Sequence, residues 1–282
     1  MLEDKLIGFI GSGSMAAAMV RGLIQSNTAK PQNILVTGKP DSERVTKLVE
    51  LWGVARSTNR EVADRADVII IAVKPKDVAS VMEEIGFLLQ ANQLVISVAA
   101  GIPTAFIEGF CSNKVQVIRS MPNTSSTVLA SATAVCKGKY AGPDAEDLAV
   151  ELFASVGMVQ RVNEEKLDVI TGLSGSGPAY VYLMIEALGT AGVQLGLDED
   201  MALALATQTV FGAAKMLLET GENPSTLRQA VSSPGGTTLA GLKALAAHGF
   251  NDALREGVKA ATNRAREMGL EYTGLGGGAQ CG

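Results

Sequence analysis

Short runs of aliphatic and β-branched residues alternate with helical patterns along roughly the first 160 residues of the chain. The runs typical of strands lie at residues 5–10, 33–37, 67–73, 93–98, 115–120, 132–136 and 158–162. Between them, apolar residues recur at helical spacing over residues 13–26, 41–52, 76–90 and 144–156. Every position from Val68 to Val73 is apolar, as expected of a strand that helices cover on both faces. This alternation predicts an α/β fold with a doubly wound parallel sheet.

The pattern changes near Asn163, after which we expect helices and no strand. Residues 180–218 carry five charged residues, and three of these, at 198–200, stand together at a predicted helix start. Helices that are apolar on all sides must be buried on all sides. We therefore expect this segment to pack against another subunit; a compact helical core without a partner is the alternative.

These changes in pattern divide the chain into three predicted parts. We expect an α/β domain at residues 1–162, an all-helical domain at 163–269 and a glycine-rich tail at 270–282. The tail has no periodic pattern and is predicted to be disordered.

Composition narrows the chemistry that the chain can perform. The 282 residues carry a formal charge of −5, which argues against nucleic acid or an anionic membrane as the main partner. One histidine and three scattered cysteines exclude most metal sites and most Ser-His or Cys-His catalysis, and favour a reducing compartment. Because no uninterrupted apolar run approaches 18 residues, we expect a soluble, cytoplasmic protein without a signal peptide.

A glycine-rich turn follows the first predicted strand. Residues 11–16 read G-S-G-S-M-A, which fits the pattern G-x-G-x-x-G/A, and a predicted helix follows. In such a turn Gly11 permits the tight bend, Gly13 lets the backbone approach a pyrophosphate and Ala16 allows close packing. The amides at the helix N-terminus would bind the anion. The turn predicts a dinucleotide site, with an ordinary strand-to-helix turn as the alternative.

The end of the second strand bears on which dinucleotide binds. An NAD-preferring site carries Asp or Glu there for the ribose hydroxyls. This chain has Thr37 at that position, and its first acid comes only at Asp41. A 2′-phosphate is then not repelled, and Lys39 or Arg44 could neutralise it. The sequence favours NADPH over NADH, unless Lys39 is only a solvated loop charge.

Other strand ends and two later segments also suggest ligand contacts. Small residues and prolines at 72–75, 98–101 and 120–124 would form a floor for the cofactor, since ligands bind outside the carboxyl ends of such strands. GLSGSGPAY at 172–180 and SSPGGTT at 232–238 each precede a helical pattern. The amides and hydroxyls of the second segment could hold a carboxylate. Capped helix starts are the alternative for both.

No acid–base pair or activated nucleophile is evident in the sequence. His248 precedes Gly249 near a predicted helix end, where a cationic side chain complements the helix dipole. Reduction of a ketone normally needs a His, Lys or Tyr partner, whereas a protonated C=N bond is already a strong electrophile. Orientation of an imine against a nicotinamide would then supply most of the catalysis.

The motifs together resemble those of the pyrroline-5-carboxylate reductase family. They are GFIGSGSMA at 8–16, AVKP at 72–75, GLSGSGPAY at 172–180 and SSPGGTT at 232–238, and the similarity spans about residues 5–269. The resemblance implies reduction of Δ1-pyrroline-5-carboxylate to L-proline with NADPH or NADH, the last step of proline biosynthesis. It also implies an N-terminal Rossmann domain, then an all-α substrate and dimerisation domain, with homodimers that can assemble into rings of five dimers.

The resemblance assigns roles to individual residues. The implied cofactor contacts are Ile10, Gly11, Ser12, Gly13, Ser14, Met15, Asn59, Val73, Lys74 and Ala100, beside Thr37 and Lys39. The implied substrate contacts are Glu164, Ser233, Gly236, Thr237 and Thr238, with Thr238 catalytic because its hydroxyl would face the ring nitrogen. One residue of slippage leaves Glu165 as the alternative to Glu164. Ala230 stands where some members carry an asparagine that touches the cofactor from a neighbouring subunit, so this chain departs from the family pattern there.

Two other functions are considered beside this one. A β-hydroxyacid dehydrogenase has a similar plan but carries a catalytic lysine on the helix after a glycine-rich segment, and residues 178–197 contain no lysine. A non-catalytic NADPH-binding protein is the second alternative, which an assay of NADPH oxidation by the pyrroline would distinguish.

Overall fold

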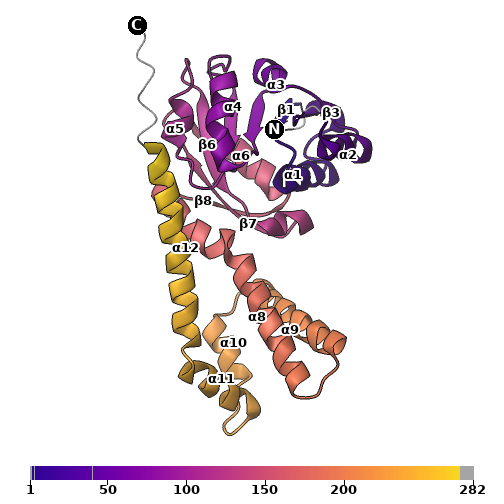
Figure 1. Cartoon of the computed structure of the whole chain (residues 1–282), viewed down its shortest axis with the longest axis vertical. Coiled ribbons are helices and arrows are strands. Elements are labelled where there is room, and N and C mark those ends of the chain that lie inside the picture. The colour runs from indigo at the N-terminus through magenta and orange to yellow at the C-terminus, as the bar shows by residue number, and fades with distance from the viewer. Residues whose placement is uncertain (1, 3, 40, 274–282) are drawn as a thin grey trace. The chain divides into compact units, whose positions relative to one another are not determined.

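The computed structural model describes residue 2, residues 4–39 and residues 41–273 (Figure 1). The chain forms two compact units. The first contains the described residues up to Ser176 together with residues 259–273, and the second runs from Gly177 to Val258. The chain therefore leaves the first unit 14 residues after the predicted boundary at 162, and it returns to that unit within its last helix.

An eight-stranded sheet forms the centre of the first unit. Its strands are β1 (Ile7–Ile10), β2 (Ile34–Val36), β3 (Ala55–Arg56), β4 (Val68–Ile71), β5 (Leu94–Ser97), β6 (Gln116–Met121), β7 (Ser131–Lys137) and β8 (Gly157–Arg161). The spatial order is β3-β2-β1-β4-β5-β6-β7-β8. The first six strands in this list follow the order found in dinucleotide-binding sheets. In that order, successive strands are added on one side of β1 up to β3 and on its other side from β4 onward. All neighbours are parallel except β6 and β7, so the predicted all-parallel sheet contains one antiparallel pair.

Helices cover both faces of this sheet. They are α1 (Ser14–Gln25), α2 (Glu43–Trp52), α3 (Asn59–Arg65), α4 (Val78–Ile85), α5 (Thr104–Glu108) and α6 (Pro143–Ala154). One buried apolar cluster joins the sheet to α1, α2 and α6, and a second joins the opposite face to α3, α4 and α5. All four residues of β4 are buried, as the apolar run beginning at Val68 predicted.

The last turns of the long helix α12 (Phe250–Thr273) belong to the first unit. The ring of Tyr272 meets that of Phe106 edge-on, with 5.0 Å between centroids. Ala265 is buried, and a Cβ added to Gly101 would lie 3.1 Å from the Cβ of Met268. The helix continues through residues 270–273, which we assigned to the disordered tail, because Tyr272 has this apolar contact. The rest of that predicted tail lies outside the described residues.

The second unit consists of helices. They are α8 (Gly177–Gln194), α9 (Glu199–Thr220), α10 (Pro224–Ala230), α11 (Thr237–Ala247) and the first turns of α12. Helices α8 and α9 run side by side (Figure 1) and approach closely at small residues, where a Cβ added to Gly192 would lie 3.1 Å from that of Ala202. Pro178 lies in the first turn of α8, as predicted. In the described part of the chain no strand follows β8, which agrees with the expected all-helical region.

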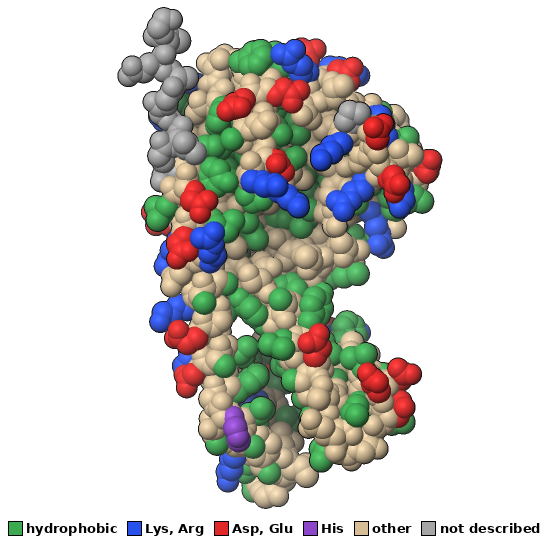
Figure 2. Space-filling model, in the orientation of Figure 1, with side chains coloured by type: hydrophobic (Ala, Val, Ile, Leu, Met, Phe, Trp, Pro, Cys, Tyr) green, Lys and Arg blue, Asp and Glu red, His purple; other side chains and the backbone are tan. Residues whose placement is uncertain are grey.

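Most large apolar side chains of the second unit are exposed. Figure 2 shows hydrophobic groups over this unit. The exposed apolar side chains of the unit include Tyr182, Leu183, Leu188, Leu203, Leu205, Phe211 and Leu218. Helix α9 is also, among the described residues, the one helix long and apolar enough to span a membrane, which by itself is weak evidence for a span. The apolar sequence of α9 is interrupted by the polar residues 207–209 (TQT), so it does not form an uninterrupted run of the length that the sequence analysis looked for. The apolar surface is large for a monomer and indicates a partner.

Candidate active site

The glycine-rich turn joins β1 to α1 as the sequence predicted. Gly11 has a φ of +108°, and a Cβ there would lie 2.6 Å from the backbone oxygen of Ala72. Gly13 differs, because no atom lies within 4 Å of the position that its Cβ would occupy. The space beside Gly13 is therefore open to a ligand that approaches the backbone closely.

The first turn of α1 suits an anion. Gly13 is the N-cap residue, so no side chain caps the helix, and the first turn carries no acidic residue. The amides of this turn and the positive end of a 12-residue helix then face the open space beside Gly13. Ser12, Ser14 and Met15 complete the turn, and the buried Ile10 fixes its start. This geometry fits the pyrophosphate of a dinucleotide.

A chain of hydrogen bonds links this turn to α3 and α4. The backbone N–H of Gly11 donates to Thr37 Oγ1 (3.4 Å), and the Thr37 hydroxyl donates to Asn59 Oδ1 (2.7 Å). The Asn59 amide donates in turn to Glu84 Oε2 (2.8 Å). These three side chains border a cavity of about 530 Å³ at the end of β2. The described residues that line it are Thr37, Gly38, Arg56, Ser57, Thr58, Asn59, Glu61 and Glu84.

Sequence reasoning named two residues of this cavity, Thr37 and Asn59, and missed Arg56 and Glu84. The sheet register places Arg56 there, since it pairs with Val36 in β2. No local signal marks Arg56, because β3 is only two residues long and both are exposed. Lys39 is exposed in the loop after β2 and is not among the lining residues of the cavity.

The other predicted cofactor residues follow the neighbouring strands. Val73 and Lys74 come after β4, and Ala100 comes after β5. Because β1, β4 and β5 are parallel, these residues and the glycine turn lie at the same edge of the sheet. Ala72 N–H donates to Ile10 O (2.8 Å), which ties two of these strand ends together. The structure thus gathers the predicted floor of the cofactor site at one sheet edge.

Glu164 makes contacts within the first unit. Its carboxylate accepts hydrogen bonds from the Thr104 backbone N–H (2.8 Å) and hydroxyl (2.7 Å), and its Oε1 lies 3.3 Å from a guanidinium nitrogen of Arg119. Arg119 is buried and also pairs with Asp168 at 3.0 Å. Of the two alternatives, Glu164 is half-buried in this network whereas Glu165 is exposed. Glu164 therefore fixes the start of α5 through Thr104.

The SSPGGTT segment forms a turn before α11 in the second unit. Gly236 N–H donates to Ser233 O (3.0 Å), and Gly235 has a φ of +75°. Gly236 is the N-cap of α11, so no side chain caps this helix, and its first turn carries no acid. The exposed hydroxyls of Thr237 and Thr238 stand at this helix start. Uncapped backbone amides and exposed hydroxyls therefore stand together at this helix start.

Side chains for other chemistry are scarce in the described residues. No group of three or more His, Cys, Asp or Glu side chains could hold a metal ion there. Burial raises the pKa of the Cys136 thiol to about 12 and that of Cys111 to about 11, so both stay protonated near neutral pH. His248 ends α11, with its Nδ1 2.9 Å from Ala244 O. Neither cysteine is suited to act as a thiolate nucleophile.

Comparison with known proteins gives matches over nearly the whole chain. The family description "Pyrroline-5-carboxylate reductase dimerisation" matches residues 164–268, and "NADP oxidoreductase coenzyme F420-dependent" matches residues 6–101. Pyrroline-5-carboxylate reductase 1 of Bacillus subtilis is 42% identical over 269 residues, which cover 95% of this chain and 91% of that protein.

Two solved structures are similar at the level of the whole fold. The pyrroline-5-carboxylate reductase of Coxiella burnetii has a TM-score of 0.88 and 40% identity, and the match covers 94% of this chain and 98% of that one. The pyrroline carboxylate reductase of Plasmodium falciparum, solved with NADP bound, has a TM-score of 0.85 and 30% identity, with coverage of 95% and 100%. These similarities include both compact units.

Proposed function

Since the chain belongs to the pyrroline-5-carboxylate reductase family, we propose that it reduces Δ1-pyrroline-5-carboxylate to L-proline with NADPH, the final step of proline biosynthesis. The observation that carries the proposal is that one chain has both a dinucleotide turn, at Gly11–Ser14, and an uncapped helix start rich in hydroxyls, at 233–238. The whole-chain identity to named reductases supports the same activity. The missing lysine in residues 178–197 argues against the dehydrogenase alternative.

The reaction needs the substrate to be held and its ring nitrogen to be protonated. When bound, NADPH supplies the hydride that C5 of the imine accepts, and it is left as NADP⁺. The amides at the start of α11 hold the substrate carboxylate, with Ser233, Gly236 and Thr237 around it. The Thr238 hydroxyl donates a hydrogen bond to the lone pair of the ring nitrogen, which polarises the C=N bond and assists proton transfer to the nitrogen as C5 accepts the hydride.

The proposed cofactor contacts keep the residues predicted from the sequence. Ile10 to Met15 hold the pyrophosphate, Thr37 and Asn59 bind the adenosine side, and Val73, Lys74 and Ala100 form the floor. Lys39 belongs to the loop beside the adenosine site. We also propose that Glu164 contacts the substrate. The ion pair with Arg119 and the hydrogen bond from Thr104 would hold its carboxylate in position for this contact.

The activity is tested by following NADPH absorbance after pyrroline-5-carboxylate is added to the purified chain. We expect NADPH to be consumed in step with proline formed, and more slowly when NADH replaces it. A six-membered cyclic imine carboxylate serves as the ring-size control, and it should react more slowly. A folded chain that binds NADPH but never oxidises it with the pyrroline would instead be a non-catalytic binding protein.

We propose that the chain works as a homodimer formed through its second unit, and that five dimers assemble into a decamer. Exposed apolar side chains on α8 and α9 support this, because they would be covered by a second copy. Such an interface also accounts for the apolar character of α9 without a membrane. The functional domains would be residues 1–162 for NADP(H), 163–269 for substrate and dimerisation, and 270–282 as a tail. We place the enzyme in the cytoplasm, without a nucleic-acid or membrane partner.

Replacement of Phe211 by glutamate is expected to break the dimer. Phe211 lies on α9 and is 58% exposed in the single chain, so a carboxylate there would be buried without a partner at the proposed interface. Light scattering should give a mass near 29.2 kDa for Phe211→Glu, and at least twice that for the unaltered chain. The control is Leu51→Glu in α2, where the leucine is 74% exposed in the first unit. Equal masses for the two variants would contradict the assignment.

A further inference from the structure

We propose that Arg56 is the residue by which this enzyme distinguishes NADPH from NADH, because its guanidinium binds the 2′-phosphate of the adenosine ribose. The inference rests on the proposed NADPH-dependent function and assigns the specificity to one side chain. Sequence reasoning pointed instead to Lys39 or Arg44.

The sheet places Arg56 beside the ribose end of the cofactor site. Arg56 pairs with Val36, the last residue of β2, and Thr37 follows directly. In dinucleotide-binding sheets the residue at the end of this strand contacts the ribose hydroxyls of the adenosine half. Thr37 is uncharged, so it neither repels nor attracts a phosphate there. The cation beside this position is Arg56, on the neighbouring strand β3.

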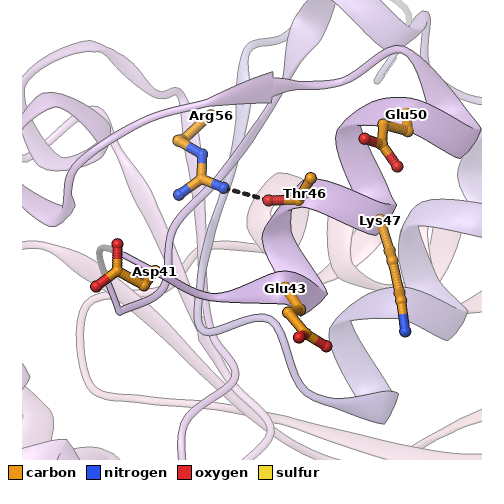
Figure 3. Close-up of a pocket in the computed structure, with 6 residues that line it drawn as sticks. All are labelled: Asp41, Glu43, Thr46, Lys47, Glu50 and Arg56. Atoms are coloured by element: carbon orange, nitrogen blue, oxygen red, sulfur yellow. Dashed lines mark hydrogen bonds between the residues drawn. The ribbon is translucent and has the colours of Figure 1, made fainter.

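Arg56 borders two cavities at this point. The first is the cavity of about 530 Å³ that Thr37 and Asn59 also line. The second, of about 410 Å³, lies over α2 and is drawn in Figure 3. The described residues that line it are Asp41, Glu43, Thr46, Lys47, Glu50 and Arg56. Among these described linings, Arg56 is the residue common to both, whereas Lys39 and Arg44 line neither.

The guanidinium is held in place from α2. A terminal nitrogen of Arg56 donates to Thr46 Oγ1 at 2.8 Å, the bond that Figure 3 marks by a dashed line. The planar fork of an arginine matches phosphate oxygens in a bidentate way, which a lysine ammonium cannot do. Arg56 is exposed, so it needs no rearrangement of the core to meet a ligand.

The carboxylates around Arg56 make its positive charge necessary for binding a 2′-phosphate. The second cavity carries the carboxylates of Asp41, Glu43 and Glu50 against the cations of Lys47 and Arg56. In the first cavity, Glu61 is bound by Ser57 and Thr58, and Glu84 is bound by Asn59. Loss of Arg56 would leave a 2′-phosphate facing mainly carboxylates, whereas an unphosphorylated ribose would be little affected.

The test compares binding of two nucleotides that differ only in the 2′-phosphate. Titration calorimetry with 2′,5′-ADP and 5′-AMP is carried out on the unaltered chain and on Arg56→Gln, which removes the charge. We expect Arg56→Gln to weaken 2′,5′-ADP by about tenfold to a hundredfold and 5′-AMP by less than about twofold. Arg56→Lys should recover only part of the loss, because the bidentate geometry is absent.

The control variant is Arg44→Ala, an exposed arginine on α2 that lines neither cavity, which should change both affinities by less than about twofold. Equal weakening of both nucleotides by Arg56→Gln would overturn the proposal, as would a selective loss of 2′,5′-ADP binding in Lys39→Ala but not in Arg56→Gln. The titrations use no imine. A chain that binds 2′,5′-ADP through Arg56 but does not reduce the pyrroline would therefore disprove the proposed reaction and leave this assignment intact.

Discussion

Replacing Thr238 by alanine is expected to lower the turnover of pyrroline-5-carboxylate by about 10²- to 10⁴-fold, the range for loss of a positioned proton donor. Thr238 lies in the first turn of α11, next to the Ser233–Gly236 turn that we propose holds the substrate carboxylate. Without the Thr238 hydroxyl, the ring nitrogen loses the hydrogen bond that polarises the C=N bond and assists its protonation. Steady-state rates from NADPH absorbance measure the loss.

The affinity for NADPH separates this role from a general defect. It should change by less than about twofold in Thr238→Ala, because the proposed pyrophosphate site lies at α1. Thr238→Ser keeps a hydroxyl and should retain most of the turnover. Thr226→Ala, at an exposed threonine on α10, is the matched control. Turnover in Thr238→Ala that equals the control would remove Thr238 from the mechanism.

Replacing Arg119 by methionine is expected to lower the free energy of unfolding by about 3–5 kcal/mol. The Arg119 side chain is 7% exposed and pairs with two carboxylates, Glu164 at 3.3 Å and Asp168 at 3.0 Å. Methionine has a similar length but no charge, so both carboxylates would lose their shared cation in a partly buried site. Denaturation by urea, followed by circular dichroism, measures the change.

An exposed ion pair provides the comparison for Arg119. Arg264 pairs with Glu267 at 3.0 Å and with Glu271 at 3.7 Å, and all three side chains are more than 60% exposed. Surface pairs of this kind contribute about 0–1 kcal/mol, so Arg264→Met should have a small effect. If the two variants lost the same stability, the buried network would not stabilise the first unit in the way that its geometry indicates.

The strongly apolar elements were predictable from the sequence, and the short ones were not. β4 appears where a run of six apolar residues predicted it, because a strand covered on both faces needs no polar positions. β3 has two exposed residues and no alternation. α3 did carry a signal, since Thr58 and Glu61 form a capping box, with Glu61 N–H donating to Thr58 Oγ1 at 3.2 Å. That spacing could have located the helix.

The same difference holds for the candidate site. The glycine turn was predictable because its residues are neighbours in the chain and each has a local conformational reason. Arg56 and Glu84 were not, since sheet register and helix packing bring them to Thr37 and Asn59 from distant positions. The direction of β7 relative to β6 is likewise set by the path of the chain and not by any pattern within either strand.

The return of α12 to the first unit has a consequence for cutting the chain. Tyr272 packs on Phe106, and Met268 lies against Gly101, so residues that follow the second unit in sequence cover α5 and the loop after β5. Topologically, residues 177–258 are an insertion with both ends tethered in the first unit. A fragment that stops at Ser176 would bare the apolar side of α5 to water. The nucleotide-binding half is thus discontinuous, and an autonomous version of it must carry the end of α12 as well.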